Sequence, residues 1–283
     1  MTIPDEITVR THTVSGGGGV RLHVEETGNP SGQPVLFLHG LSQSGYTWHR
    51  QMQSDLARDL RLVTIDLRGH GQSDRPVDAY GDPDLWARDV AAVIRSLELE
   101  RPILSGWSYG GVVICDYLSR YGDDGIGGIQ LVGAISRLGE SVLPFLGERF
   151  LAVVPGLFST DVEESVAALH TFGRLLTREP LPQAESYRIL GIAADTPPRV
   201  RQGLLNRSLD YDGLLADLRT PVLITHGSDD EVVLPAMAEH HASTIRTART
   251  SIHPGVGHAP FWEDPDRFNA ELHAFATGQS PLG

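Results

Sequence analysis

The sequence predicts an α/β protein in which a mostly parallel β-sheet is covered by helices on both faces. Short, continuously apolar runs such as residues 34–38 have the composition of strands that are buried on both faces of a sheet. Amphipathic stretches separate these runs, most clearly at residues 82–99, where apolar side chains recur at helical spacing. Strands that alternate with helices along a chain favour a mostly parallel sheet with crossover helices.

The chain begins with a predicted β-hairpin. Residues 6–14 and 20–27 alternate between apolar and polar side chains, and Ser15 followed by four glycines separates them. A phosphate-binding loop would need a following helix and a lysine, and the glycine run has neither. We therefore interpret the glycine run as a turn.

The first half of the chain then repeats the strand–helix pattern. We expect strands at 34–38, 62–65, 102–104 and 128–134, and helices at about 47–60, at 82–99 and after residue 111. Asp66 follows one of these strands and is expected to brace the turn formed by residues 66–74.

The pattern changes at about residue 136. From there to residue 212, amphipathic helical stretches are separated by prolines, and no clear strand is visible. The sheet pattern returns with a predicted strand at 221–227, a helix at 235–245, a strand at 249–253 and a helix at 265–276. We therefore predict one α/β core formed by residues 1–135 and 213–283, with residues 136–212 inserted as a helical cap.

Composition and charge narrow the class of protein. A chain of 283 residues can bury a large core without disulfides, and its only cysteine, Cys115, falls in a predicted helix, where a buried thiol is expected.

The formal net charge of −13 argues against binding to nucleic acid or anionic membranes, which are bound through clustered cations. No apolar run is long enough to span a membrane, and no targeting segment is recognisable. We expect a cytoplasmic protein that acts on a small molecule, and its oligomeric state is left open.

The chain contains no lysine, because all 23 of its Lys and Arg residues are arginines. This absence excludes Schiff-base catalysis, lysine-anchored pyridoxal phosphate and the lysine-dependent phosphate loop. His240 and His241 fall on a predicted surface helix, without the paired spacing of metal ligands. We predict neither a metal ion nor a cofactor.

Residues 105–111, Ser-Gly-Trp-Ser-Tyr-Gly-Gly, join a predicted buried strand to a predicted helix. Ser108 lies at the apex of this sharp turn, where Gly106 and Gly110 leave room for a strained backbone. This is the G-x-S-x-G pattern of a nucleophile elbow. We therefore predict that Ser108 is a catalytic nucleophile.

A catalytic serine needs a base, and the base needs an acceptor that fixes its tautomer. In elbow folds a carboxylate and then a histidine follow the serine, each after a late strand. Asp229 and Asp230 both follow the predicted strand that ends at Gly227, and His258 follows the next strand. The residues alone leave open which aspartate takes part, and His253 is the alternative base.

Five motifs in this order resemble the α/β-hydrolase superfamily, in the branch that contains small bacterial esterases, lactonases and cofactor-free haloperoxidases. They are His39-Gly40, residues 69–73 (Gly-His-Gly-Gln-Ser), the elbow, residues 227–230 (Gly-Ser-Asp-Asp) and residues 257–265 (Gly-His-Ala-Pro-Phe-Trp-Glu-Asp-Pro). The resemblance spans nearly the whole chain and is weakest in the predicted cap. It implies the α/β-hydrolase fold, with an eight-stranded sheet.

The resemblance also implies roles for individual residues. The family pattern places the acid three residues after the strand-terminal glycine, which selects Asp230 and leaves Asp229 as a turn residue. The backbone N–H groups of Leu41 and Tyr109 would form the oxyanion hole, with His39 holding the turn that presents Leu41. The predicted catalytic residues are therefore Ser108, Asp230 and His258.

These residues predict a serine hydrolase that cleaves a carboxylic ester or a lactone of a small molecule through an acyl-enzyme on Ser108. Two alternatives stay open: a relative with the same triad that hydrolyses a C–C bond or carries out perhydrolysis, and a small-molecule receptor of the same fold without turnover. Aromatic side chains of the cap, such as Phe145 and Phe158, are expected to set substrate preference. The candidates for lining an acyl pocket are Trp48, Trp107, Phe145, Phe150 and Phe158.

Overall fold

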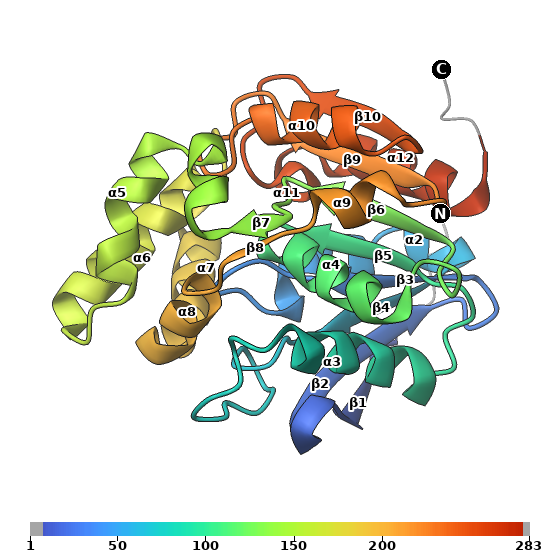
Figure 1. The fold of residues 1–283 in the computed structure, drawn as a ribbon, viewed down its shortest axis with the longest axis horizontal. Helices are drawn as coiled ribbons and strands as arrows, with labels where there is room; N and C mark the ends of the chain where they lie inside the picture. Colours follow the sequence, from blue (N-terminus) through green and yellow to red (C-terminus); the bar gives the residue numbers. More distant parts are fainter. Residues whose placement is uncertain (1–7, 280–283) are drawn as a thin grey trace.

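An eight-stranded β-sheet forms the centre of the structure, a computed structural model that describes residues 8–279 (Figure 1). Its strands are β1 (Arg10–Ser15), β2 (Arg21–Gly28), β3 (Gln33–Leu38), β4 (Leu60–Ile65), β5 (Ile103–Trp107), β6 (Gly128–Val132), β9 (Val222–Gly227) and β10 (Ala248–His253). Their order is β1-β2-β4-β3-β5-β6-β9-β10. The pairings of β1 with β2 and of β2 with β4 are antiparallel, and the other pairings in this sheet are parallel. The predicted fold class is therefore confirmed.

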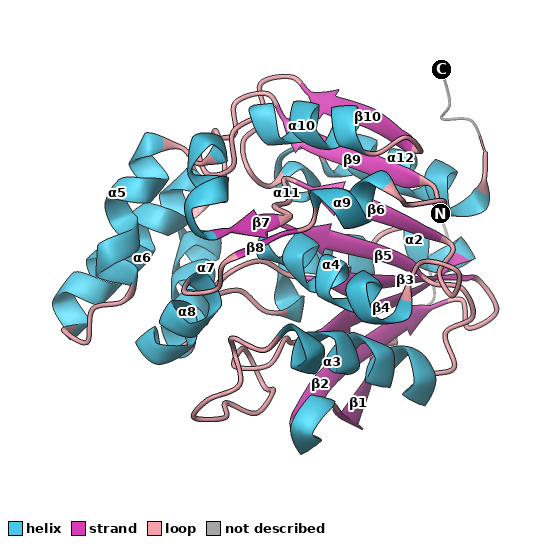
Figure 2. Cartoon of the chain, viewed as in Figure 1, coloured by secondary structure: helices cyan, strands magenta, loops and turns pink. Residues whose placement is uncertain are grey.

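Helices cover both faces of this sheet, as Figure 2 shows. In front of the sheet in Figure 1 lie α3 (Pro83–Ser96), α4 (Tyr109–Tyr121), α9 (Asp212–Ala216) and α10 (Ala236–Thr244). Behind it lie α1 (His49–Met52), α2 (Leu56–Asp59), α11 (Pro260–Glu263) and α12 (Pro265–Thr277). Because both faces are covered, central-strand side chains such as Leu36, Leu104 and Val222 are fully buried.

Four further helices, α5 to α8, project beyond one end of the sheet, at the left in Figure 1. They are α5 (Glu148–Leu157), α6 (Val162–Leu175), α7 (Gln183–Asp195) and α8 (Pro198–Leu205). The side chain of Asp161 caps α6 by accepting the N–H of Glu164 at 2.9 Å, and Pro198 occupies the first turn of α8. The helices lie within the predicted cap, whose boundaries at residues 136 and 212 remain a prediction.

A second, two-stranded sheet lies where the chain enters and leaves these helices. It pairs β7 (Arg137–Leu138) antiparallel with β8 (Leu209–Asp210). The expectation that residues 136–212 contain no strand is therefore wrong. Two residues are too few to produce an alternating pattern, so the sequence carries no signal for this pairing.

Two other local expectations need correction. The helix expected at about 47–60 is broken into the 3₁₀ helix η2 (Gly45–Trp48), α1 and α2. Ser54 causes the last break, because its hydroxyl donates to the carbonyl of Gln51 and accepts the N–H of Leu56. His241 does not lie on the surface: its side chain is buried and lies 2.9 Å from the hydroxyl of Ser136.

The predicted hairpin and the predicted turns have defined contacts. The glycine run contains the 3₁₀ helix η1 (Gly17–Gly19), and the N–H of Gly17 donates to Asp89 at 2.8 Å. Residues 6 and 7 of the predicted hairpin lie outside the described residues. Asp66 accepts the N–H of Gln72 at 2.8 Å and that of Gly45 at 2.6 Å, which confirms that it braces the turn after β4. Cys115 is buried, as expected.

Candidate active site

Ser108 lies between the end of β5 and the start of α4, on a strained backbone. Its φ of 55° and ψ of −117° are unusual for a residue with a side chain. The turn is tight enough to require glycine on both sides: a Cβ at Gly106 would lie 2.7 Å from the carbonyl oxygen of Gly110, and one at Gly110 would lie 2.5 Å from that of Leu38. The elbow geometry expected from the sequence is present.

His258 and Asp230 form a buried pair at the carboxyl edge of the sheet. Nδ1 of His258 lies 2.7 Å from Oδ2 of Asp230. The other oxygen of Asp230 accepts the backbone N–H groups of Val232 at 2.8 Å and Val233 at 2.9 Å. Burial raises the pKa of Asp230, but the charge of His258 and the hydrogen bond from His226 lower it further, so the carboxyl group remains ionised.

Asp229 points away from this pair. The hydroxyl of Ser228 donates to Asp229 at 2.8 Å, and Nε of Arg178 lies 3.3 Å from its other oxygen. The side chain is 42% exposed, so this ion pair is solvated. The structure therefore brings Asp230, and not Asp229, to His258.

The loop that carries His258 is anchored to the elbow. Nε1 of Trp107, the residue before Ser108, donates to the carbonyl of His258 at 2.8 Å. The N–H of Gly257 donates to Glu263 at 2.7 Å, which fixes the loop from the other side. Within residues 8–279, Nε2 of His258 is buried and has no hydrogen-bond partner. This nitrogen is the one that can accept a proton.

His253, the alternative base, lies elsewhere. Its ring nitrogens contact Asp264 at 3.2 Å and Glu271 at 3.1 Å, and its side chain is buried. These contacts hold β10 against α12.

Leu41 and Tyr109, whose backbone N–H groups are the expected oxyanion donors, both lie beside Ser108. Tyr109 is the first residue of α4, so its N–H has no partner inside the helix. Leu41 lies in the loop after β3, and both residues line the same cavity as Ser108. His39 shapes this loop: its Nδ1 contacts the carbonyl of Gly40 at 2.8 Å, and its Nε2 accepts the N–H of Leu67 at 3.0 Å. That arrangement agrees with the structural role expected for His39.

The cavity beside Ser108 has a volume of about 340 Å³ and is mainly apolar. It lies beside α5 and α6, and Glu140 supplies the one carboxylate among the residues that line it. The lining residues are Leu41, Ser108, Tyr109, Ile135, Leu138, Gly139, Glu140, Val142, Leu143, Leu146, Phe150, Leu151, Val154, Phe172, Leu205, Val232 and Val233. A cavity of this size and character suits a small, mostly apolar ligand.

The aromatic side chains expected to line the cavity do so in only one case, that of Phe150. Trp48 packs against Phe37 and Phe261, and Trp107 packs against His258. Phe145 contacts His240, and Phe158 packs against the hydrophobic core. Phe172 of α6 also lines the cavity but was not among the expected residues, because helical spacing does not say which face of a helix points inward.

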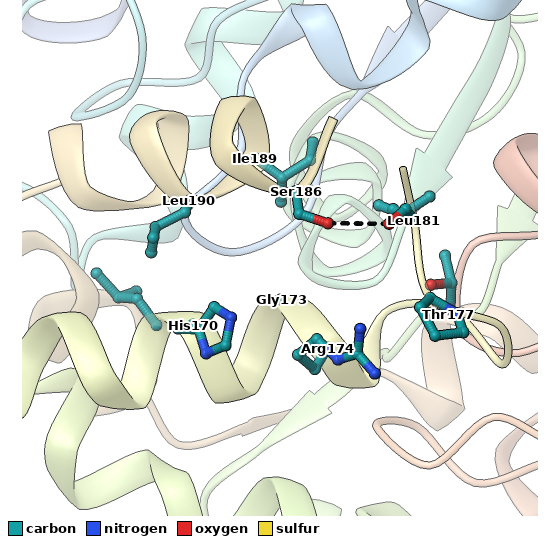
Figure 3. Close-up of a pocket in the computed structure, with 10 residues that line it drawn as sticks. His170, Gly173, Arg174, Thr177, Leu181, Ser186, Ile189 and Leu190 are labelled. Atoms are coloured by element: carbon teal, nitrogen blue, oxygen red, sulfur yellow. Dashed lines mark hydrogen bonds between the residues drawn. The ribbon is translucent and has the colours of Figure 1, made fainter. Parts of the chain in front are cut away.

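Figure 3 shows a second hollow, a crevice of about 20 Å³ between α6 and α7. His170 and Arg174 line it from α6, and Ser186 donates to the carbonyl of Leu181 on its other side at 3.2 Å. The crevice has room for about one water molecule and does not include Ser108. It is therefore not a substrate site.

A buried ion pair that was not expected from the sequence connects α4 to the chain that follows α8. Nη2 of Arg207 lies 2.6 Å from Oδ1 of Asp116, and its Nη1 donates to the hydroxyl of Tyr109 at 3.0 Å. The hydroxyl of Tyr211 donates to the same oxygen of Asp116 at 2.6 Å. The network thus holds the side chain of Tyr109 beside the elbow. No local motif predicts this network, because its hydrogen-bonded partners lie 91 to 98 residues apart in the sequence.

Residues 33–265 match the protein-family model described as "alpha/beta hydrolase fold". The match covers most of the chain, which therefore belongs to the α/β-hydrolase family and is an enzyme of the carboxylic ester hydrolase kind. The resemblance inferred from the five sequence motifs is confirmed.

Individual relatives agree with this assignment. The chain is similar to the crystal structure of esterase RhEst1 from Rhodococcus sp. ECU1013, with 41% identity, a TM-score of 0.91 and coverage of 95% of this chain and 99% of that chain. It is 27% identical over 272 residues to a non-heme haloperoxidase of Rhodococcus erythropolis, covering 93% of this chain and 98% of the relative. It is 28% identical over 276 residues to the bifunctional esterase/perhydrolase DCH of Acinetobacter calcoaceticus, covering 91% and 96%.

No helix in residues 8–279 is long and apolar enough to cross a membrane. The same residues contain no group of three or more His, Cys, Asp and Glu side chains that could hold a metal ion.

Proposed function

We propose that this hydrolase cleaves small carboxylic esters through an acyl-enzyme on Ser108. Ser108 is the nucleophile, His258 the general base and Asp230 the carboxylate that orients His258. The observation that carries the proposal is the buried 2.7 Å contact between Asp230 and Nδ1 of His258, which leaves Nε2 of His258 without a partner among the described residues. A histidine held in this way has the tautomer that a general base requires.

The steps of the reaction follow from these positions. Nε2 of His258 takes the proton of Ser108 while the serine oxygen attacks the ester carbonyl. The N–H groups of Leu41 and Tyr109 donate to the oxyanion of the tetrahedral intermediate. His258 then gives its proton to the leaving alcohol. Water, deprotonated in turn by His258, hydrolyses the acyl-enzyme and restores Ser108.

The cavity supports a substrate with an apolar acyl group and no negative charge. Its walls are mainly leucine, valine and phenylalanine, and its volume of about 340 Å³ fits a small acyl chain. The carboxylate of Glu140 disfavours an anionic acyl group by repulsion. A lactone of similar size and polarity would satisfy the same contacts.

A second activity, perhydrolysis, is favoured by one relative. DCH of Acinetobacter calcoaceticus is named as a bifunctional esterase/perhydrolase and matches 91% of this chain. In that reaction hydrogen peroxide takes the place of water, attacks the acyl-enzyme and leaves as a peroxy acid. The same nucleophile, base and oxyanion donors would serve both reactions.

The proposed function is tested with a substrate panel and a Ser108→Ala variant. Wild-type protein should turn over p-nitrophenyl esters of short acids repeatedly, whereas Ser108→Ala should lose at least about 10⁴-fold in kcat/KM. Lactones, C–C cleavage diketones and hydrogen peroxide as acyl acceptor complete the panel. Turnover by Ser108→Ala at the wild-type rate would refute the serine mechanism, and a single stoichiometric burst from wild type would favour the receptor.

A further inference from the structure

A second histidine contacts the carboxylate that holds His258. Nε2 of His226 lies 3.2 Å from Oδ2 of Asp230, the same oxygen that lies 2.7 Å from Nδ1 of His258. Both histidine side chains and the carboxylate are buried. Because His226 belongs to β9, the central sheet fixes its position relative to Asp230.

The chemistry of the neighbours assigns the proton on His226. Its Nε2 lies 2.8 Å from the carbonyl oxygen of Val233 as well as near Asp230, and both neighbours can only accept hydrogen bonds. Nε2 of His226 therefore carries a proton and shares it between the two oxygens. Asp230 accordingly has two backbone donors on one oxygen and two imidazole donors on the other.

We propose that His226 is a positioning residue of this site: its Nε2–H fixes Asp230 and weakens the attraction of that carboxylate for protonated His258. The inference rests on the proposed function, in which His258 is the base. A hydrogen bond to a carboxylate withdraws negative charge from it, so Asp230 stabilises the imidazolium form of His258 less than it would alone. Loss of this donor would therefore let Asp230 hold the imidazolium form of His258 more strongly, and the acid limb of the activity would move to higher pH.

Within residues 8–279, the titratable groups that interact with His226 are Asp230 and His241 of α10. Asp230 in turn contacts His258 and interacts with Glu263 of α11. Burial lowers the pKa of His226, but the hydrogen bond and charge of Asp230 raise it more. Burial lowers the pKa of His241 to about 3, so His241 stays neutral over the range in which an esterase is assayed.

The test compares His226→Leu with His226→Gln. Leucine removes the donor, whereas the glutamine amide places an N–H₂ group where Nε2 of His226 lies. The readout is the midpoint of the acid limb of kcat/KM for p-nitrophenyl butyrate. We expect His226→Leu to move this midpoint upward by about half a pH unit or more, and His226→Gln to leave it within about 0.2 of a unit of wild type.

His241→Gln is the matched control, because His241 is equally buried but contacts Ser136 instead of Asp230. It should leave the midpoint unchanged whatever its effect on the melting temperature. If His226→Leu does not fold, His226→Asn takes its place, since its shorter amide does not reach Asp230. A midpoint in the donor-free variant equal to that of wild type would overturn the inference.

Failure of the inference is distinguishable from failure of the proposed function. If Ser108→Ala retains wild-type turnover, the proposed function fails. The imidazole titration of His258 followed by NMR then still measures the effect of His226, because it needs no turnover. If activity depends on Ser108 but neither the acid limb nor the NMR titration shifts in His226→Leu, His226 has only a structural role.

Discussion

Asp230→Asn tests the proposed role of the Asp230 carboxylate while it keeps the other contacts of this side chain. In the variant, the side-chain oxygen stays on the N–H groups of Val232 and Val233, which lie 2.8 and 2.9 Å from Oδ1 of Asp230. The new NH₂ group then replaces Oδ2, which lies 2.7 Å from Nδ1 of His258. An amide nitrogen donates, so Nδ1 of His258 must accept and its proton moves to Nε2. A histidine in that tautomer cannot take the proton of Ser108.

The opposite orientation of the asparagine amide is unfavourable. It would direct the NH₂ group at the two backbone N–H groups and leave these buried donors without an acceptor. In a related triad, the same substitution costs about 10⁴-fold in kcat, which corresponds to about 5.5 kcal/mol of transition-state stabilisation. We expect a loss of this size in kcat/KM for p-nitrophenyl butyrate, with a melting temperature close to that of wild type.

Asp229→Asn is the control, because Asp229 is the neighbouring carboxylate with a different set of contacts. Its exposed pair with Arg178 is worth at most about 1 kcal/mol, so the variant should keep activity within about tenfold. The reverse ranking of the two variants would assign the acid to Asp229. Two mild effects would refute the reasoning altogether, since the carboxylate would then come from elsewhere.

Two further predictions concern the cavity and the stability of the fold. Phe150→Leu should raise the ratio of kcat/KM for hexanoate over butyrate esters, because Phe150 lines the cavity, whereas Phe158→Leu should not; equal ratios in all three proteins would contradict the assigned lining. Burial lowers the pKa of His70 to about 4 and that of His241 to about 3. Unfolding lets these imidazoles bind protons below about pH 6.5, so the free energy of unfolding should fall as the pH drops from about 6.5 toward about 4. Denaturant unfolding over this pH range measures the free energy of unfolding. A constant value would show that His70 and His241 titrate alike in the folded and unfolded states.

The sheet and the elbow could be predicted because their signals are local. The continuously apolar run at 34–38 matches β3, and the amphipathic run at 82–99 matches α3 to within three residues at its end. The glycines of the G-x-S-x-G pattern are required sterically, because Gly110 approaches the backbone of Leu38 too closely to carry a side chain. Such features depend on neighbours in the sequence, so composition and period are enough to find them.

The remaining features depend on contacts between distant segments. The sequence could not choose between Asp229 and Asp230 without the family pattern, because the choice is made by two backbone N–H groups and by a loop 28 residues further on. The proposed role of His226 could not be predicted from the sequence either, because a histidine near a strand end forms no distinctive sequence pattern. In the cap, the rotation of each helix decides whether Phe150 or Phe158 faces the cavity, and both positions are apolar.

The central claim is that Ser108 is the one activated serine of the chain, and covalent labelling tests it most directly. A fluorophosphonate probe reacts quickly only with a serine whose proton is removed by a neighbouring base. Incubation of the active enzyme with the probe, followed by intact-mass measurement and peptide mapping, should find one label per chain, on Ser108, with loss of esterase activity in proportion to labelling. Ser108→Ala should remain unlabelled. A label on a different serine, or full loss of activity without any label on Ser108, would contradict the account.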